Sequence, residues 1–327
     1  MAGATPVPRR WLVVGGTGFL GSHVLSVVRA LAGIEQVVAT GRTPPAGDGD
    51  WAVLDLARGD ARSIDALLRH VRPDVVVNAS GAAVGAPAEL AAANVTAVRA
   101  LLDAIGRWSP RRAAGPIRLV HLGSAAEYGV ASTTGRPIGE DSPPHPVSEY
   151  GALKLEATRQ VLAAASATVD PVVLRIFNPM GAGMPPESLP GIAARRLAAA
   201  VHDGRPEVML GSLDASRDFV DARDVAAAVV AAGSAPDHSG VVINVGSGTA
   251  TPVRDVVKML ARAAGFNGRI VESGSGSARS GGVDWQAADI QRARALLRWE
   301  PRHGLEDAVE QLWASVAGPG QSAASRR

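Results

Sequence analysis

The chain has 327 residues, with 33 Lys and Arg against 31 Asp and Glu, 46% hydrophobic residues and no cysteine. The apolar fraction is typical of a folded globular protein, and the length suits one large α/β unit or two domains that share a cleft. The absence of cysteine excludes disulfides, zinc–thiolate sites, iron–sulfur clusters and a cysteine nucleophile. The nearly balanced charge gives little support to nucleic-acid binding.

The amino-terminal half alternates short apolar strands with amphipathic helices. Strands are expected at 11–14, 36–40, 51–54, 74–78 and 117–123, with helices at 20–31, 64–71 and 89–108 between them. Strands that are apolar throughout and are joined by helices predict a doubly wound α/β fold, in which a parallel sheet is covered on both faces.

The carboxy-terminal half is less regular. It is expected to hold helices at 148–165, 189–203, 251–264, 286–297 and 304–317, and strands at 171–177, 208–210 and 241–245. The segment 218–232 is expected to begin as a strand or turn and to become a helix. The proline-rich stretch 179–190 reads as a loop that covers a substrate, and 273–282 reads as a Gly/Ser-rich loop. We expect disordered tails at 1–9 and 318–327.

A glycine-rich turn follows the first expected strand. Gly15, Gly18 and Gly21 have the spacing that lets backbone N–H groups at a helix start approach a pyrophosphate. A plain turn is the alternative. The expected cofactor contacts in this turn are Gly15, Thr17, Gly18, Phe19, Leu20 and Gly21.

The end of the second strand bears on the choice between NAD and NADP. An acid there would bind the ribose 2′-hydroxyl, but the run Ala39-Thr40-Gly41-Arg42 contains none. Arg42 favours the 2′-phosphate of NADP(H), with NAD(H) as the alternative. Asp55, followed by Leu56, is placed either to bind the adenine amine or to cap a helix.

Tyr150 and Lys154 are four positions apart in the sequence and therefore share one helix face. A nearby ammonium stabilises a phenolate, so such a tyrosine can exchange a proton with a carbonyl or hydroxyl oxygen. Ser124, at the end of the fifth strand, can hold the same oxygen. The chain has only two tyrosines and two lysines, which makes this pairing more specific than the spacing alone.

The chain resembles the extended short-chain dehydrogenases/reductases, in the nucleotide-sugar branch of the NAD-dependent epimerase/dehydratase family. The resemblance spans about 11–313 and is carried by Gly15-Gly-Thr-Gly-Phe-Leu-Gly21, Asp55-Leu56, Asn94-Val95, Ser124-Ala-Ala-Glu-Tyr-Gly129, Tyr150-x-x-x-Lys154, Arg175-Ile-Phe-Asn178, Arg217-Asp-Phe-Val-Asp221 and Asn244-Val-Gly-Ser-Gly248. The stretch 210–219 is most similar to GDP-4-keto-6-deoxymannose reductases and their GDP-sugar relatives.

This resemblance implies a Rossmann-type dinucleotide-binding domain of 10–177 plus about 214–248. A smaller α/β substrate domain would comprise about 178–213 plus 249–317. The helices around 89–108 and 148–165 would pair two copies into a homodimer. No membrane partner is expected, since no segment has the roughly 20 apolar residues of a membrane span. The start of the chain does not read as a signal peptide, so a cytoplasmic protein is expected.

The resemblance also implies roles for individual residues. Ser124, Tyr150 and Lys154 match the catalytic triad, with Lys154 also holding the nicotinamide ribose and Asn94 supporting the lysine. The implied substrate contacts, of which the last three match positions that bind the diphosphate, are Ser80, Ser124, Glu127, Asn178, Arg217 and Arg279. Glu127 is alternatively a structural acid, and Arg279 alternatively a mobile loop charge.

One departure from the family bears on the reaction. The 4,6-dehydratases carry an Asp-Glu pair directly after the catalytic Ser or Thr, where this chain has Ala125 and Ala126. Alanine cannot transfer protons, so dehydration is not expected. The predicted function is an NADP(H)-dependent ketoreductase of a nucleotide-activated sugar, typically a 4-keto-6-deoxyhexose. A sugar 4-epimerase with tightly bound NAD and a non-catalytic cofactor-sensing protein are the alternatives.

Overall fold

The computed structural model describes residues 8–43, 50–58, 61–108, 115–130, 135–235, 238–273 and 282–317. Its centre is a seven-stranded sheet in the order β11-β6-β5-β4-β1-β2-β3, in which every neighbouring pair is parallel. The strands are β1 (Arg10–Val14), β2 (Gln36–Gly41), β3 (Asp50–Val53), β4 (Val75–Asn78), β5 (Ile117–Ser124), β6 (Val169–Ile176) and β11 (Val241–Val245).

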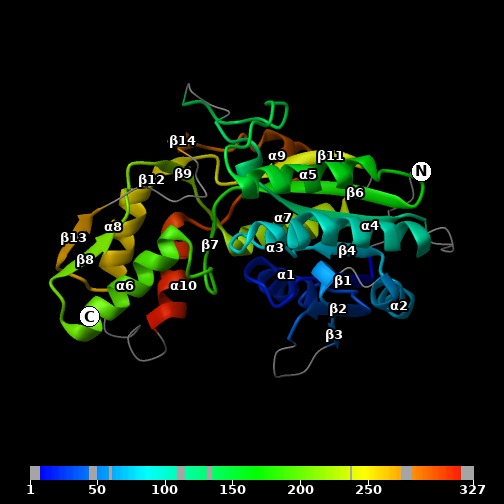
Figure 1. Cartoon of the computed structure of the whole chain (residues 1–327), viewed down its shortest axis with the longest axis horizontal. Helices are drawn as coiled ribbons and strands as arrows, with labels where there is room; N and C mark the ends of the chain where they lie inside the picture. The colour runs from blue at the N-terminus through cyan, green and yellow to red at the C-terminus, as the bar shows by residue number, and fades with distance from the viewer. Residues whose placement is uncertain are drawn as a thin grey trace.

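Helices cover both faces of this sheet (Figure 1). The apolar side chains of α1 (Phe19–Arg29), α7 (Ala222–Ser234) and α9 (Gln291–Leu297) join one core cluster on one face. Those of α2 (Ala61–Val71), α4 (Ala97–Trp108) and α5 (Glu149–Ala163) join a second cluster on the other. The predicted doubly wound fold, with its apolar strands buried between helices, is thus confirmed.

The strand order reverses between β1 and β4. From β1, the chain adds β2 and then β3 toward one edge of the sheet. It then returns to the other side of β1 and adds β4, β5, β6 and β11 toward the opposite edge. In parallel sheets, ligands bind at the carboxyl ends of the two strands that flank such a reversal. The glycine turn after β1 and Ser80 after β4 therefore lie at the same edge.

A smaller group of elements lies to one side of the sheet (Figure 1). It contains α6 (Leu189–Asp203), β8 (Glu207–Leu210), β9 (Ser216–Asp218), β12 (Ala250–Pro252), α8 (Val253–Ala263), β13 (Arg269–Glu272), β14 (Trp285–Gln286) and α10 (Leu305–Ala317). Side chains from α6, α8 and α10 form a separate core. Two short strands, β7 (Pro179–Met180) and β10 (Val220–Asp221), pair in parallel beside α7.

The region expected as one helix at 89–108 is divided. The structure has α3 (Pro87–Ala91), a π-helical turn η2 (Ala92–Thr96) and then α4. The Asn94 side chain explains why the helix widens into a π-helical turn here, since its amide donates to the carbonyl of Leu90 at 2.9 Å and to that of Ala82 at 2.8 Å. A side chain that bonds the carbonyl four residues back competes with the regular helical ladder.

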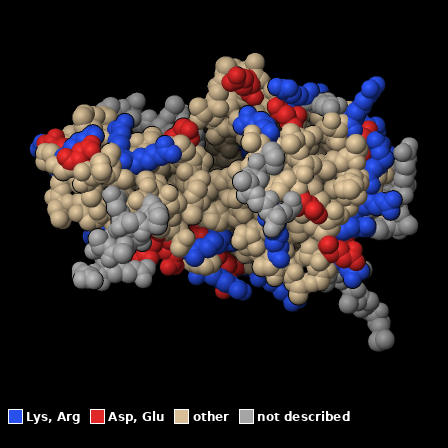
Figure 2. Space-filling model, turned by 90° about the horizontal axis from the view of Figure 1, so that it is seen from below, with Lys and Arg blue, Asp and Glu red and all other residues tan. Residues whose placement is uncertain are grey.

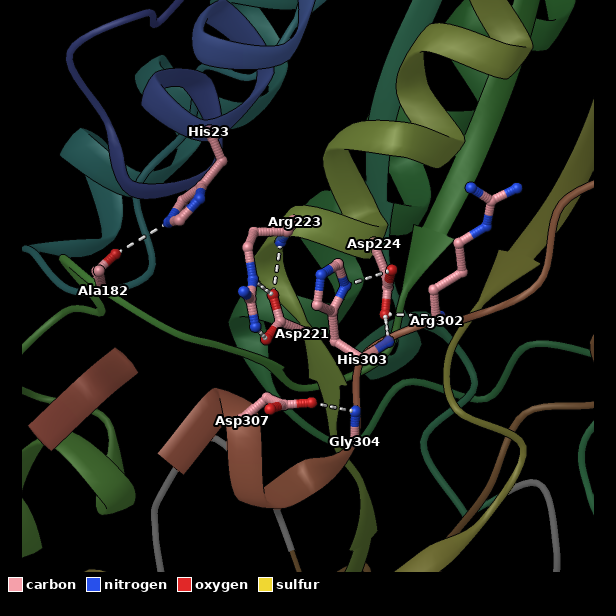
Figure 3. Close-up of polar contacts among 9 residues, drawn as sticks. All are labelled: His23, Ala182, Asp221, Arg223, Asp224, Arg302, His303, Gly304 and Asp307. Carbon is pink, nitrogen blue, oxygen red and sulfur yellow. Dashed lines mark hydrogen bonds and ion pairs between the residues drawn. The ribbon is translucent and has the colours of Figure 1, made fainter. Parts of the chain in front are cut away.

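A polar cluster joins the sheet to the smaller group of elements (Figure 3). Asp224, at the start of α7, accepts the backbone N–H groups of Arg302 (3.0 Å) and His303 (2.9 Å) and the His303 ring at 2.8 Å. His23 of α1 contacts the carbonyl of Ala182 at 2.9 Å. Within the described ranges, no helix has the length and apolar character needed to cross a lipid bilayer.

Candidate active site

The glycine turn has the geometry of a phosphate-binding turn. Gly15 has φ +80°, a conformation that L side chains rarely adopt, and a Cβ at Gly21 would clash with the Gly15 carbonyl. Gly18 is the N-cap of α1 and has no side chain that could accept a hydrogen bond, so the first N–H groups of the helix have no side-chain cap. These donors fit a pyrophosphate.

The exposed end of β2 carries Arg42, and no acidic residue follows within the described part of that turn. A Cβ at Gly41 would lie 2.7 Å from the Thr17 hydroxyl oxygen, so Thr17 packs directly on β2. Asp55 accepts the N–H of Ala57 at 3.1 Å and pairs with Arg58 at 3.5 Å. This is the helix-capping arrangement, and Leu56 beside it is buried.

Ser124 and the Tyr150–Lys154 pair lie on adjoining elements. Ser124 ends β5, while Tyr150 and Lys154 are on the first turns of α5, whose N-cap Ser148 accepts the N–H of Gly151 at 3.2 Å. A Cβ at Gly151 would clash with the Ala126 carbonyl, so α5 approaches the turn after Ser124 very closely. The structure therefore brings the three predicted catalytic residues to one place.

Lys154 is 5% exposed and donates a 2.5 Å hydrogen bond to the Leu122 carbonyl of β5. Burial lowers the pKa of Lys154 from 10.5 to about 8, and the nearby Glu127 carboxylate acts in the opposite direction. An ammonium that is buried yet still ionised at neutral pH supplies a strong local positive potential beside Tyr150.

The Ser124 hydroxyl oxygen accepts the N–H of Ala126 at 3.2 Å. Because the oxygen is the acceptor in that bond, its own proton remains available for a second partner. The Ser124 backbone N–H donates to Glu127 Oε1 at 2.8 Å. Both bonds fix the serine at the carboxyl end of β5.

Glu127 is fully buried, and its second carboxylate oxygen accepts from Arg175 Nε at 2.8 Å. The Arg175 guanidinium lies 4.5 Å from the ring centroid of Tyr128, whose hydroxyl donates to Asn244 Oδ1 at 2.7 Å. Of the two roles left open for Glu127, this arrangement favours the structural acid. Arg175, Tyr128 and Asn244 belong to motifs visible in the sequence, but the spacing gave no sign that they support Ser124.

Two asparagines line the other side of the site. Asn94 is buried, and its Oδ1 has no hydrogen-bond partner among the described residues. It lies against Gly81, where a Cβ would be 2.8 Å from that oxygen. Ser80 donates both its hydroxyl (2.6 Å) and its N–H (3.1 Å) to Asn78 Oδ1.

The predicted substrate residues of the smaller group occupy distinct settings. Asn178 donates to the Asp218 carbonyl at 2.9 Å. Arg217 is 7% exposed and donates to the backbone carbonyls of Ser216 and Val283, with no ion pair to any described residue. Burial lowers the pKa of Arg217, against the influence of Asp284. Arg279 lies outside the described residues.

The surface between the two groups of elements is hollowed near the middle of one face, and basic side chains lie on both sides of the hollow (Figure 2). No group of three or more His, Asp or Glu side chains in the described ranges could hold a metal ion. The arrangement thus offers a glycine turn that fits a dinucleotide, a tyrosine one helical turn from a buried ammonium, and a buried arginine that makes no ion pair with any described residue.

Comparison with known proteins agrees with this geometry. The chain is 40% identical over 318 residues to dTDP-6-deoxy-L-talose 4-dehydrogenase (NAD(P)(+)) of Kitasatospora kifunensis, covering 94% of this chain and 96% of that protein. It is 30% identical to a UDP-glucose 4-epimerase of Azospirillum brasilense, covering 99% of both. It is 29% identical to GDP-6-deoxy-D-mannose reductase of Pseudomonas aeruginosa, covering 81% of this chain and 83% of that protein.

Among solved structures, MoeE5 in complex with UDP-glucose and NAD superposes with a TM-score of 0.78 at 30% identity, covering 93% of this chain and 97% of that chain. The family model described as the NAD dependent epimerase/dehydratase family matches residues 11–246. The family and the nucleotide-sugar resemblance predicted from the motifs are confirmed. The chain is an enzyme of the extended short-chain dehydrogenase/reductase type, and it belongs to the NAD dependent epimerase/dehydratase family.

Proposed function

We propose that the chain is an NADPH-dependent ketoreductase that acts on a nucleotide-activated 4-keto-6-deoxyhexose. The observation that carries the proposal is the buried Lys154 ammonium, held on β5 two residues from Ser124 and one helical turn from Tyr150. The 40% identity to a dTDP-6-deoxy-L-talose 4-dehydrogenase supports a dTDP-sugar. The GDP-sugar predicted from 210–219 is the second candidate base, supported by the 29% identity to a GDP-sugar reductase.

The residues present fit a dinucleotide. The N–H groups at the start of α1, which have no side-chain cap, and the close approach of Gly15 and Gly21 suit a pyrophosphate, and Arg42 suits a 2′-phosphate. A bound reduced nicotinamide would supply the hydride. The NADP(H) preference rests on Arg42 and on the missing acid after β2.

The chain's own residues perform the proton chemistry. The Ser124 hydroxyl donates a hydrogen bond to the keto oxygen and orients it, keeping its own proton, and Tyr150 transfers one proton to that oxygen as negative charge develops. Lys154 stabilises the resulting phenolate through its charge. Ala125 and Ala126 offer no acid or base for dehydration.

The diphosphate of the substrate would lie toward Asn178 and Arg217, with Arg279 as a further predicted contact. Arg217 is buried without an ion-pair partner in the described ranges, and a guanidinium in that setting is suited to a phosphate. Two copies are proposed to pair through α4 and α5, as the family resemblance implies.

A 4-epimerase with tightly held NAD is the second candidate, because the chain is 30% identical to a UDP-glucose 4-epimerase over 99% of both chains. Mass spectrometry of the nucleotide released on denaturation separates the two. Stoichiometric NAD would support the epimerase, whereas NADP(H), or an empty site that binds NADPH better than NADH, supports the reductase.

The direct test follows NADPH oxidation at 340 nm with dTDP- and GDP-4-keto-6-deoxyhexoses. Tyr150→Phe should abolish turnover while NADPH still binds. Full activity in that variant would contradict the proposed mechanism. If neither sugar nucleotide is turned over, the proposed substrate class is wrong.

A further inference from the structure

His23 joins the helix that follows the glycine turn to a segment of the smaller group of elements (Figure 3). It lies half-buried on α1, and its Nε2 is 2.9 Å from the carbonyl oxygen of Ala182, 159 residues further along the chain. A carbonyl oxygen can only accept a hydrogen bond, so Nε2 carries a hydrogen and donates it. The proposed reaction does not use this bond.

The His23 ring also contacts the start of α1. It packs edge-on against Phe19, with the ring centroids 5.5 Å apart and an angle of 88° between the planes. Phe19 is the first residue of α1, directly after the N-cap Gly18, and is a predicted cofactor contact. The imidazole is therefore placed by the same turn of helix that would receive the pyrophosphate.

The backbone opposite His23 passes close to the helices of the sheet. Gly181 has φ +154°, a conformation that L side chains rarely adopt. A Cβ there would lie 3.3 Å from the Cβ of Ala222, at the start of α7, and 4.0 Å from His23 Nε2. A glycine suits this approach, which presents the next carbonyl, that of Ala182, to His23.

The segment 180–184 is held by the smaller group as well as by α1. Met180 is fully buried and Met184 partly buried in the core formed with α6, α8 and α10. The Gly183 N–H donates to Ser315 Oγ of α10 at 3.4 Å. Contacts from both groups of elements therefore meet on these few residues.

The same segment leads directly from a predicted substrate residue. Asn178 donates through its amide to the Asp218 carbonyl at 2.9 Å, and its own carbonyl accepts the Val220 N–H at 3.2 Å. Ala182 lies four positions after Asn178, and β7, which pairs with β10, lies between them. A displacement of Ala182 is therefore transmitted to Asn178 through a short, paired stretch of chain.

None of the other contacts drawn in Figure 3 involves α1. Asp224, at the start of α7, binds the chain at Arg302 and His303. Among these contacts, the bond from His23 is the one through which occupancy of the glycine turn can reach the substrate segment.

Resting on the proposed function, we propose that His23 is a positioning residue that couples the cofactor and substrate sites. A dinucleotide on the glycine turn fixes Phe19 and the start of α1. His23 then holds the Ala182 carbonyl, which keeps Asn178 in place for the substrate diphosphate. Each ligand binds more tightly when the other is present, since such a coupling is reciprocal.

Calorimetry of a non-reacting pair of ligands tests the coupling without turnover. The probes are dTDP and GDP, titrated with and without a saturating oxidised cofactor, NADP⁺ or NAD⁺, whichever binds more tightly. In the wild type, the cofactor should lower the Kd of the nucleoside diphosphate about tenfold.

Two substitutions of His23 separate its ring from its hydrogen bond. His23→Phe keeps an aromatic ring beside Phe19 but has no N–H donor, so it should bring the coupling factor close to one. His23→Gln keeps a donor and should recover most of the factor. If the cofactor cannot be removed, the loaded proteins still decide, because His23→Phe should weaken diphosphate binding about tenfold there.

Ser315→Ala is the matched control, because it removes the α10 bond to the Gly183 N–H and leaves α1 untouched. It should leave the coupling factor at the wild-type value. A purely structural role for His23 would lower the melting temperature of His23→Phe and leave its coupling factor, and its diphosphate affinity in the loaded protein, unchanged. That result, or a wild-type factor of one, overturns the inference.

Hydrogen exchange in the wild type is the second readout, and it decides if His23→Phe does not fold. The oxidised cofactor alone should slow exchange in the segment 179–184, and no change there overturns the inference. During keto-sugar reduction, His23→Phe should raise KM with little change in kcat.

The proposed function fails separately from this inference. If coupling is present in the wild type and lost in His23→Phe, yet no keto-sugar nucleotide is reduced, the positioning role holds and the proposed reductase is wrong. If the wild type reduces a keto-sugar nucleotide but the cofactor does not change diphosphate affinity, the reductase stands and the positioning role is wrong.

Discussion

The Lys154 ammonium donates a hydrogen bond to the carbonyl of Leu122, two residues before Ser124. This bond joins α5 to β5 at the point where the proposed chemistry takes place, and it holds a charge in a buried setting. Burial lowers the pKa of Lys154 to about 8, so the charged form is less stable in the folded chain than in the unfolded chain. Catalytic potential and folding stability are therefore opposed at this residue.

Lys154→Met should stabilise the protein at neutral pH and abolish reduction. The fall from 10.5 to about 8 corresponds to about 3 kcal/mol against the charged form, and loss of the Leu122 bond removes about 1 kcal/mol. A gain of about 2 kcal/mol in unfolding free energy is expected below pH 8. Urea denaturation of both proteins measures it.

The pH dependence has a definite sign. Between pH 8 and 10.5, Lys154 is protonated in the unfolded chain but mostly neutral in the folded chain, so the unfolding free energy of the wild type increases as pH rises through this window. The stability difference between the methionine variant and the wild type therefore disappears. Lys258→Met, at an exposed position, should change stability by less than about 0.5 kcal/mol at any pH. A gain from Lys154→Met that does not depend on pH would contradict the burial argument.

Glu127→Gln should reduce both stability and turnover. The variant leaves the buried Arg175 guanidinium without its carboxylate partner, which typically costs about 3 kcal/mol, and it weakens the hold on the Ser124 N–H. Thermal unfolding and kcat are the measurements. If Glu127 instead binds the sugar, KM should rise sharply while stability stays near that of the wild type.

A double-mutant cycle separates these outcomes. Glu127→Gln combined with Arg175→Met removes both charges, so it should recover much of the stability lost in the single variant. Simple additivity of the two single variants would show that the ion pair does not couple them.

The sequence predicted the sheet well because its strands are apolar runs bounded by glycine, proline and polar residues. Each strand expected in the first 123 residues occurs within one residue at either end. The glycine turn and the Tyr150–Lys154 pair were equally visible, since local spacing alone defines them. A parallel order with a reversal beside β1 follows from the same alternation of strand and helix.

Other features depend on contacts that spacing does not reveal. The π-helical turn at Asn94 arises from a side-chain bond to the Leu90 carbonyl, which leaves the apolar period almost unchanged. The role of Glu127, as a sugar contact or as a structural acid, depends on its ion pair with Arg175, which lies 48 residues away and is not visible in local spacing. His121 reads as one polar residue in an apolar strand, and its hydrogen-bond partner, Asn78, comes from β4.

Arg42→Ala should weaken NADPH binding and leave NADH binding nearly unchanged. If Arg42 pairs with the 2′-phosphate at the end of β2, its loss should raise the Kd for NADPH about tenfold. Fluorescence titration of the reduced cofactors measures both constants. Arg262→Ala, an exposed arginine on α8 in the smaller group of elements, is the matched control. Equal weakening of both cofactors would count against an NADP preference based on Arg42.

Asp224→Ala should destabilise the junction between α7 and the segment leading to α10 (Figure 3). Asp224 is 2% exposed and accepts three hydrogen bonds from Arg302 and His303, so its removal leaves two backbone donors without their partner, at about 3 kcal/mol. The matched control is Asp307→Ala, which removes the exposed bond to the Gly304 N–H at 2.9 Å and should cost about 1 kcal/mol. Hydrogen exchange should report faster opening of 302–317 in the Asp224 variant. Equal losses of stability in the two variants would show that burial of Asp224 does not distinguish it from a surface cap.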